Sequence, residues 1–122
     1  MIPELAIQPY DEVGLTVRAT NGTDGTITVT NYSTGQCVSK TFSGSALCLQ
    51  DAEWIIENAS DPGYLPAVFE TFSLTDARAT LTNGSVVGPT SAGAKVLELE
   101  SGGEVYTETS PGENSVTVRY TQ

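Results

Sequence analysis

The chain has 122 residues, enough for one domain with its own core but near the size at which every strand matters. Fifteen Asp and Glu against five Lys and Arg give a net charge of −10 at pH 7, so nucleic acid is not an expected partner. The absence of His excludes a Ser-His-Asp triad, a Cys-His pair and a His-rich zinc site. Any chemistry must therefore use carboxylates, amides and hydroxyls, and neither metal nor cofactor is expected.

Alternating apolar residues predict strands along most of the chain. The first two cover residues 14–20 and 25–33, separated by the hairpin turn "NGTDG". Further strands are predicted, in chain order, over residues 36–42, 52–58, 67–77, 78–81, 94–100, 104–110 and 115–121. No segment has a helical period, and Gly or Pro interrupts the pattern about every ten residues. The sequence therefore predicts an all-β protein, an antiparallel β-sandwich that forms a single domain over residues 1–122.

The predicted strand 52–58 contains the chain's only Trp between two carboxylates. Side chains alternate along a strand, so Glu53 and Glu57 share one face with Ile55, while Trp54 and Ile56 share the other. We expect Trp54 and Ile56 to face the core between the sheets. The pattern alone favours an ordinary solvated strand, and its alternative is a catalytic Glu53 held in a groove.

Several features are typical of a secreted protein. The composition is acidic, Cys37 and Cys48 are candidates for a disulfide, and two buried free thiols are the alternative. Four N-x-S/T sequons are candidate glycosylation sites, at Asn21, Asn31, Asn58 and Asn83. The opening "MIPELAIQPY" lacks a basic segment and a long apolar core, so no signal peptide is predicted there. No apolar run approaches the roughly 18 residues of a membrane span, and no membrane association is expected.

The segment "LCLQDAEWIIENAS" (47–60) resembles that of the eqolisins, the fungal glutamic peptidases, in which a Cys and a few polar residues precede Ala-Glu-Trp-Ile and a further acidic residue. "TGQCVSKTFSG" (34–44) resembles the preceding strand of that family, and "FETFSLTDARAT" (69–80) the following one. "GSVVGPTSAGAKVLELE" (84–100) and "TETSPGENSVTVRYTQ" (107–122) resemble its closing strands. The resemblance covers nearly the whole chain and corresponds to the C-terminal half of an eqolisin. The order of these segments makes it more specific than a lone motif.

Eqolisins fold as two large antiparallel sheets packed as a concanavalin-like sandwich, and they cleave peptide bonds in acid with a Glu and a Gln. The resemblance places the catalytic Glu at Glu53, with Trp54 and Glu57 as candidates for the substrate groove. A carboxylate there would act as general base toward a water and then give its proton to the leaving amine. The resemblance also implies a protein or peptide substrate, no cofactor and an extracellular location.

The chain departs from the family pattern in several places. In the family, the catalytic Gln lies upstream of the matching region, and so does a Cys able to pair with the one that matches Cys48. The Gln residues of this chain do not correspond to the catalytic one: Gln8, Gln36, Gln50 and Gln122. Cys37 stands where the family has a small residue, so it becomes the candidate partner of Cys48. Glu70 stands where a Gly is usual.

These departures leave two functional hypotheses. The first is an acid-acting glutamic endopeptidase, or the Glu53-bearing part of one. The alternative is a non-catalytic β-sandwich that serves as a binding or structural module. In either case the sandwich is expected to lack the family's N-terminal strands. Its open sheet edges would then be covered by an N-terminal segment or by a homo-oligomer.

Overall fold

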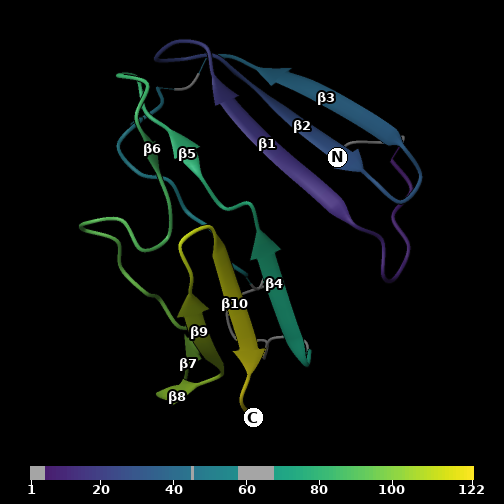
Figure 1. Cartoon of the computed structure of the whole chain (residues 1–122), viewed down its shortest axis with the longest axis vertical. Coiled ribbons are helices and arrows are strands. Elements are labelled where there is room, and N and C mark those ends of the chain that lie inside the picture. The colour runs from purple at the N-terminus through teal and green to yellow at the C-terminus, as the bar shows by residue number, and fades with distance from the viewer. Residues whose placement is uncertain (1–4, 45, 58–67) are drawn as a thin grey trace. The chain divides into compact units, whose positions relative to one another are not determined.

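The computed structural model describes residues 5–44, 46–57 and 68–122, whose regular structure consists of ten β-strands (Figure 1). Every strand pair among them is antiparallel, which confirms the predicted all-β, antiparallel class. Within these ranges there is no helix of the length and hydropathy needed to cross a membrane. The chain divides into two compact units, Met1–Asp51 and Ala52–Gln122. The single domain over residues 1–122 stays a prediction.

The first unit contains a three-stranded sheet in the order β1-β2-β3 (Figure 1). β1 is Val13–Ala19, β2 is Gly25–Asn31 and β3 is Gln36–Phe42, so the strands predicted over this region are correct to within two residues. The predicted hairpin turn between β1 and β2 is also present. The side-chain Oδ1 of Asn21 accepts hydrogen bonds there from the N–H groups of Thr23, at 2.7 Å, and Asp24, at 2.9 Å. Asn in a turn commonly makes such bonds to the residues that follow it.

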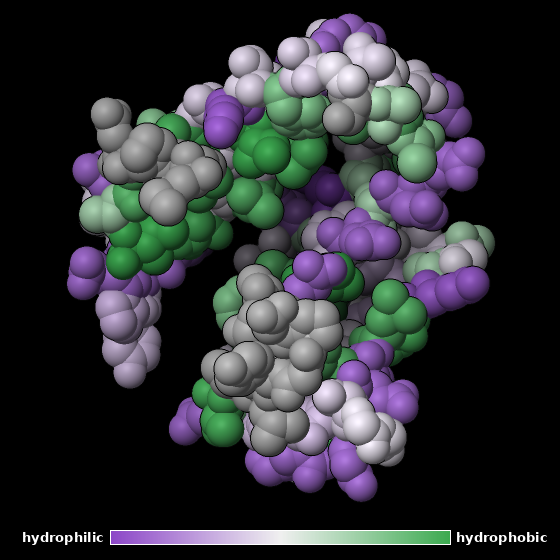
Figure 2. Space-filling model, turned by 180° about the vertical axis from the view of Figure 1, so that it is seen from behind, coloured by the Kyte–Doolittle hydropathy of each residue, from purple (hydrophilic) through white to green (hydrophobic). Residues whose placement is uncertain are grey.

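The β1-β2-β3 sheet is two-sided, as the period-two pattern predicts. One side, called here the apolar face, carries most of the apolar residues: Val13, Leu15, Val17, Ala19, Ile27, Val29, Val38 and Phe42. The register also places Gly25, Asn31, Gln36 and Lys40 on this side. Hydrophobic side chains of this unit gather on one surface in the upper left of Figure 2. Leu15 is 69% exposed and Val17 is 63% exposed. The opposite side carries mostly hydroxyls, and the Thr28 and Ser39 hydroxyls are hydrogen-bonded across it at 2.8 Å.

A buried amide ties the segment before β1 to the turn after β2. Asn31 ends β2 and is fully buried. Its Nδ2 donates to the carbonyl of Ala6, at 3.1 Å, and to Oδ2 of Asp11, at 2.7 Å. Its Oδ1 accepts from the backbone N–H groups of Ser33 and Thr34, at 3.0 and 3.2 Å. The side chain is fully bonded, as burial of a polar group requires.

The second unit contains a three-stranded sheet in the order β4-β10-β9. β4 is Thr71–Thr75, β9 is Thr107–Pro111 and the central β10 is Ser115–Tyr120. The buried apolar side chains of the described residues all belong to this unit: Ala77, Val116 and Val118. A strand was predicted over 67–77, and its described part is a strand only from Thr71 to Thr75.

Two short hairpins complete the second unit. β5 (Ala79–Thr80) pairs with β6 (Val86–Val87), and β7 (Glu100–Ser101) pairs with β8 (Glu104–Val105). The sequence predicts the second hairpin around Gly102 and Gly103, whose φ angles of 62° and 85° lie in the left-handed region that glycine adopts readily. β6 was not predicted, because two residues are too few to show a period.

The strand predicted over 94–100 is wrong for residues 94–99. A side chain takes the place of regular backbone pairing there: Glu98 accepts hydrogen bonds from the backbone N–H of Thr109, at 2.8 Å, and from the hydroxyl of Thr107, also at 2.8 Å. The Thr107 hydroxyl accepts in turn from the N–H of Leu99, at 2.8 Å. The segment is thus attached to β9 mainly through side chains, which no alternation of apolar residues reveals.

Candidate functional site

The predicted site segment, residues 52–57, is not a strand, so the strand predicted over 52–58 is wrong for these residues. None of the described strands pairs with it, and a strand requires the hydrogen bonds of a neighbour. Its side chains nevertheless alternate in exposure. Glu53, Ile55 and Glu57 are exposed, whereas Trp54 and Ile56 are half-buried. The alternation in exposure predicted for this segment is therefore present, with Trp54 and Ile56 less exposed than Glu53.

Glu53 and Glu57 present their carboxylates to solvent. Among the described residues, neither carboxylate accepts a hydrogen bond or joins an ion pair; the ion pairs seen there join Arg78 with Asp76 and Arg119 with Glu108. An exposed carboxylate without a protein partner is accessible to a water and to a peptide. The groove expected at Glu53 stays a prediction.

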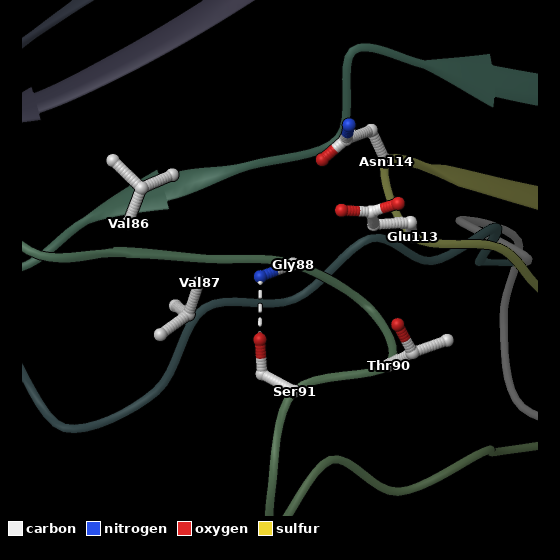
Figure 3. Close-up of a pocket in the computed structure, with 7 residues that line it drawn as sticks. All are labelled: Val86, Val87, Gly88, Thr90, Ser91, Glu113 and Asn114. Carbon is white, nitrogen blue, oxygen red and sulfur yellow. Dashed lines mark hydrogen bonds between the residues drawn. The ribbon is translucent and has the colours of Figure 1, made fainter.

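A hollow lies elsewhere in the second unit, between β6 with the segment that follows it and the β9–β10 turn (Figure 3). Its volume is about 590 Å³, and it is lined by Val86, Val87, Gly88, Thr90, Ser91, Glu113 and Asn114. The Gly88 N–H donates to the hydroxyl of Ser91 at 2.9 Å. The hollow holds one carboxylate and no second acid or base, so its lining provides no catalytic pair. Glu53 is not part of the lining, and the sequence pattern singled out none of these residues.

The predicted disulfide between Cys37 and Cys48 is absent, and both thiols are free and exposed. Cys37 pairs with Thr30, beside the β2–β3 turn. Cys48 follows Leu47, whose N–H donates to the carbonyl of Gly22, in the β1–β2 turn, at 2.8 Å. These turns lie at opposite ends of β2, whose residues rise roughly 3.3 Å each. A disulfide needs Cα atoms about 4.4–6.8 Å apart, so the intervening strand keeps the two thiols from pairing.

The sequons differ in their surroundings. Asn21 and Asn83 are exposed in turns, Asn31 is fully buried, and Asn58 lies outside the described residues. The hydrogen bonds that hold Asn31 leave its amide nitrogen no room for a sugar, which argues against the candidate glycan at that position.

Two carboxylates have pKa values below their ordinary range. Hydrogen bonds from the Gln8 backbone N–H and from the Asn31 amide lower the pKa of Asp11, against a smaller opposing effect of burial. Partial burial raises the pKa of Glu98, but the hydrogen bonds from Thr109 and Thr107 together lower it by more. Neither group belongs to the segment around Glu53. No group of three or more Asp, Glu or Cys side chains in the described ranges is arranged to hold a metal ion.

Residues 1–120 match the model of the peptidase A4 family. The chain belongs to this family. It is 42% identical to aspergillopepsin-2 of Aspergillus niger over 122 aligned residues, which cover 96% of this chain and 42% of that protein. The chain therefore spans less than half the length of this curated relative.

Solved structures give the same relationship. The crystal structure of aspergilloglutamic peptidase from Aspergillus niger has a TM-score of 0.86 and 41% identity, covering 98% of this chain and 71% of that one. SCP-B, a member of the eqolisin family solved in complex with the tripeptide Ala-Ile-His, has a TM-score of 0.77 and 29% identity, covering 96% of this chain and 63% of that one. The resemblance to eqolisins and the predicted fold class are thereby confirmed.

Proposed function

We propose that this peptidase A4 chain carries the carboxylate half of a glutamic endopeptidase site, with Glu53 as the catalytic group. The observation that carries the proposal is the position of Glu53 within Ala52-Glu53-Trp54-Ile55, inside a family match over residues 1–120. The family's amide partner, a Gln, would come from a segment that this sequence does not contain.

The chemistry assigned to Glu53 uses one carboxyl twice. The carboxylate takes a proton from a water, whose oxygen attacks the carbonyl carbon of the scissile peptide bond. The amide partner stabilises the oxyanion that forms on the carbonyl oxygen. The protonated Glu53 then gives its proton to the nitrogen of the leaving amine as the carbon–nitrogen bond breaks. Atoms and charge balance without any group beyond water and the peptide.

The local structure is consistent with this role. The exposed Glu53 can reach a water or a peptide, and Trp54 next to it is half-buried. Glu57 and Trp54 are the proposed groove residues. The complex of SCP-B with a tripeptide supports a peptide as the ligand of this site. The acidic composition and the exposed sequons support an extracellular location.

The test supplies the missing half. The N-terminal part of aspergilloglutamic peptidase that this chain does not cover is added in trans, or fused ahead of residue 1, and cleavage of a denatured protein is measured in acid. The isolated chain should be weak or inactive, because losing one oxyanion donor typically costs about 10²–10³ in rate. In the completed protein, Glu53→Gln should lower kcat by about 10²–10⁴, the usual contribution of a general acid-base group.

Glu57→Gln is the comparison variant, since it removes an exposed carboxylate from the same segment. As a groove residue that only tunes the local charge, Glu57 should be needed less than Glu53, so this variant should retain activity at least in part. If completed Glu53→Gln cleaves as fast as the parent, the catalytic assignment is wrong. A completed parent that folds and binds a peptide without cleaving it would favour the non-catalytic binding module.

A further inference from the structure

Three of the four sequons lie in the described part of the chain, and the structure distinguishes their amides. Asn31 is fully buried, and its Nδ2 makes two hydrogen bonds, to the carbonyl of Ala6 and to Asp11. An N-linked glycan attaches a bulky sugar through this same nitrogen. Asn31 therefore serves the fold as a buried bridge and cannot carry a glycan in the folded unit.

Asn21 is exposed, but its amide is used within the β1–β2 turn. Nδ2 donates to Oδ2 of Asp24 at 2.6 Å, while Oδ1 accepts from the backbone N–H groups of Thr23 and Asp24. A glycan on this nitrogen would replace one of its two hydrogens and leave a single N–H for the bond to Asp24. At Asn21 the nitrogen that would carry the glycan is therefore already engaged by the turn, in contrast to that of Asn83.

Asn83 has the arrangement that a glycan acceptor needs. It is exposed in the turn that joins β5 to β6, where the N–H of Gly84 donates to the carbonyl of Leu81 at 2.9 Å. Oδ1 of Asn83 accepts from the backbone N–H of Ser85 at 2.9 Å and from its hydroxyl at 2.6 Å. No described residue accepts a hydrogen bond from Nδ2. The Ser85 hydroxyl thus bonds to the carboxamide oxygen of Asn83, and the carboxamide nitrogen of Asn83 has no partner among the described residues.

We propose that Asn83 is the glycan acceptor among these three sequons. Its Nδ2 would form a bond to the anomeric carbon of an N-acetylglucosamine whose bond to a lipid diphosphate breaks. The diphosphate leaves with the bonding electron pair, and the amide loses a proton to the surrounding base. The donor is a lipid-diphosphate-linked oligosaccharide, which the secretory pathway of a eukaryotic host supplies. This assignment is independent of the peptidase proposal, because it concerns the β5–β6 turn alone.

The test expresses the full chain behind an added leader peptide in a secreting yeast. The secreted protein is deglycosylated in heavy-oxygen water, so that each occupied Asn becomes a mass-labelled Asp, and every sequon is read by peptide mapping. We expect the label at Asn83, a lower or absent label at Asn21 and none at Asn31. Asn83→Gln and Ser85→Ala should each abolish the label at position 83 and speed the protein's migration in a gel.

Asn21→Gln is the matched control and should leave the Asn83 label unchanged. Ser85→Ala retains the backbone bond from residue 85 to Asn83, so this variant keeps the turn while losing the sequon. An unlabelled Asn83 in the secreted parent would overturn the proposal. So would a label at Asn31 in the folded protein, or occupancy at Asn21 that equals that at Asn83.

Discussion

At the scale of single residues, the Glu98 side chain connects the segment before β7 to β9 in the second unit. Its carboxylate accepts three hydrogen bonds from β9, from the Thr107 hydroxyl and from both the N–H and the hydroxyl of Thr109. Because Thr107 is 4% exposed, removing its acceptor would leave a nearly buried hydroxyl poorly paired. Glu98 therefore keeps residues 94–99 attached to the sheet.

Glu98→Gln should destabilise the protein at neutral pH by about 1 kcal/mol, the size of a charged hydrogen bond discounted for solvent screening. Partial burial raises the pKa of Glu98 but its hydrogen bonds lower it further, so the net pKa lies below the usual 4.5. The stabilisation is complete above the pKa of the unfolded chain and is lost as the pH falls through the lower folded value. The deficit of the variant should therefore shrink in strong acid. Urea unfolding of the parent and of Glu98→Gln, at neutral pH and in strong acid, measures this deficit.

Glu100→Gln is the control for this prediction, because no described donor bonds to the Glu100 carboxylate. It should change the free energy of unfolding by less than about 0.5 kcal/mol at either pH. A Glu98→Gln deficit of the same size in acid and at neutral pH would contradict the assigned role of the charge.

At the scale of elements, the first sheet depends on a close approach at Gly25, the first residue of β2. A methyl group added there would collide with the ring of Phe42, on β3, and would lie 2.7 Å from the carbonyl oxygen of Arg18, on β1. Gly25→Ala should therefore cost about 1–3 kcal/mol in urea unfolding, as overpacking does. Gly22→Ala, in the adjoining turn, meets no atom within 4 Å and should be nearly neutral. Equal stability of the two variants would show that the three strands are less tightly packed than the structure indicates.

Strands were predictable where local pattern and turn chemistry agree, as in β1 to β3 and in β10. The strand predicted over 104–110 is divided in the structure between β8 and β9. The prediction fails at residues 52–57 because local alternation does not show whether a segment has a neighbouring strand to pair with. It fails at residues 94–99 because local alternation does not show that the Glu98 side chain replaces backbone pairing. At the candidate site, the sidedness of Glu53 and Trp54 was predictable for the same local reason. The disulfide prediction was wrong because a short separation along the chain does not tell which end of a strand each cysteine occupies. The burial of the Asn31 amide could not be predicted either, because a sequon motif carries no information on burial.

At the scale of the whole molecule, Cys37 and Cys48 decide whether the chain carries an internal disulfide. Cys37 and Cys48 are free and exposed, so a thiol reagent should label both under native conditions. The mass of the unreduced, unlabelled chain should equal the sum of its residues. Cys37→Ser should take one label instead of two. A chain two hydrogens lighter that resists labelling would mean that the first unit rearranges to bring these cysteines together.

The apolar face of the first sheet has a consequence for how stability depends on temperature. An ordinary chain of 122 residues has a heat capacity of unfolding of about 1.5–1.8 kcal/mol/K, which arises mostly from apolar surface newly exposed to water. Leu15 and Val17 are already more than half hydrated in the folded state, and the described residues bury three apolar side chains. Unfolding of the described residues should therefore add less apolar hydration than is usual for a chain of this length. The resulting stability curve would be unusually flat, and cooling or warming near room temperature would change the free energy of unfolding only slightly.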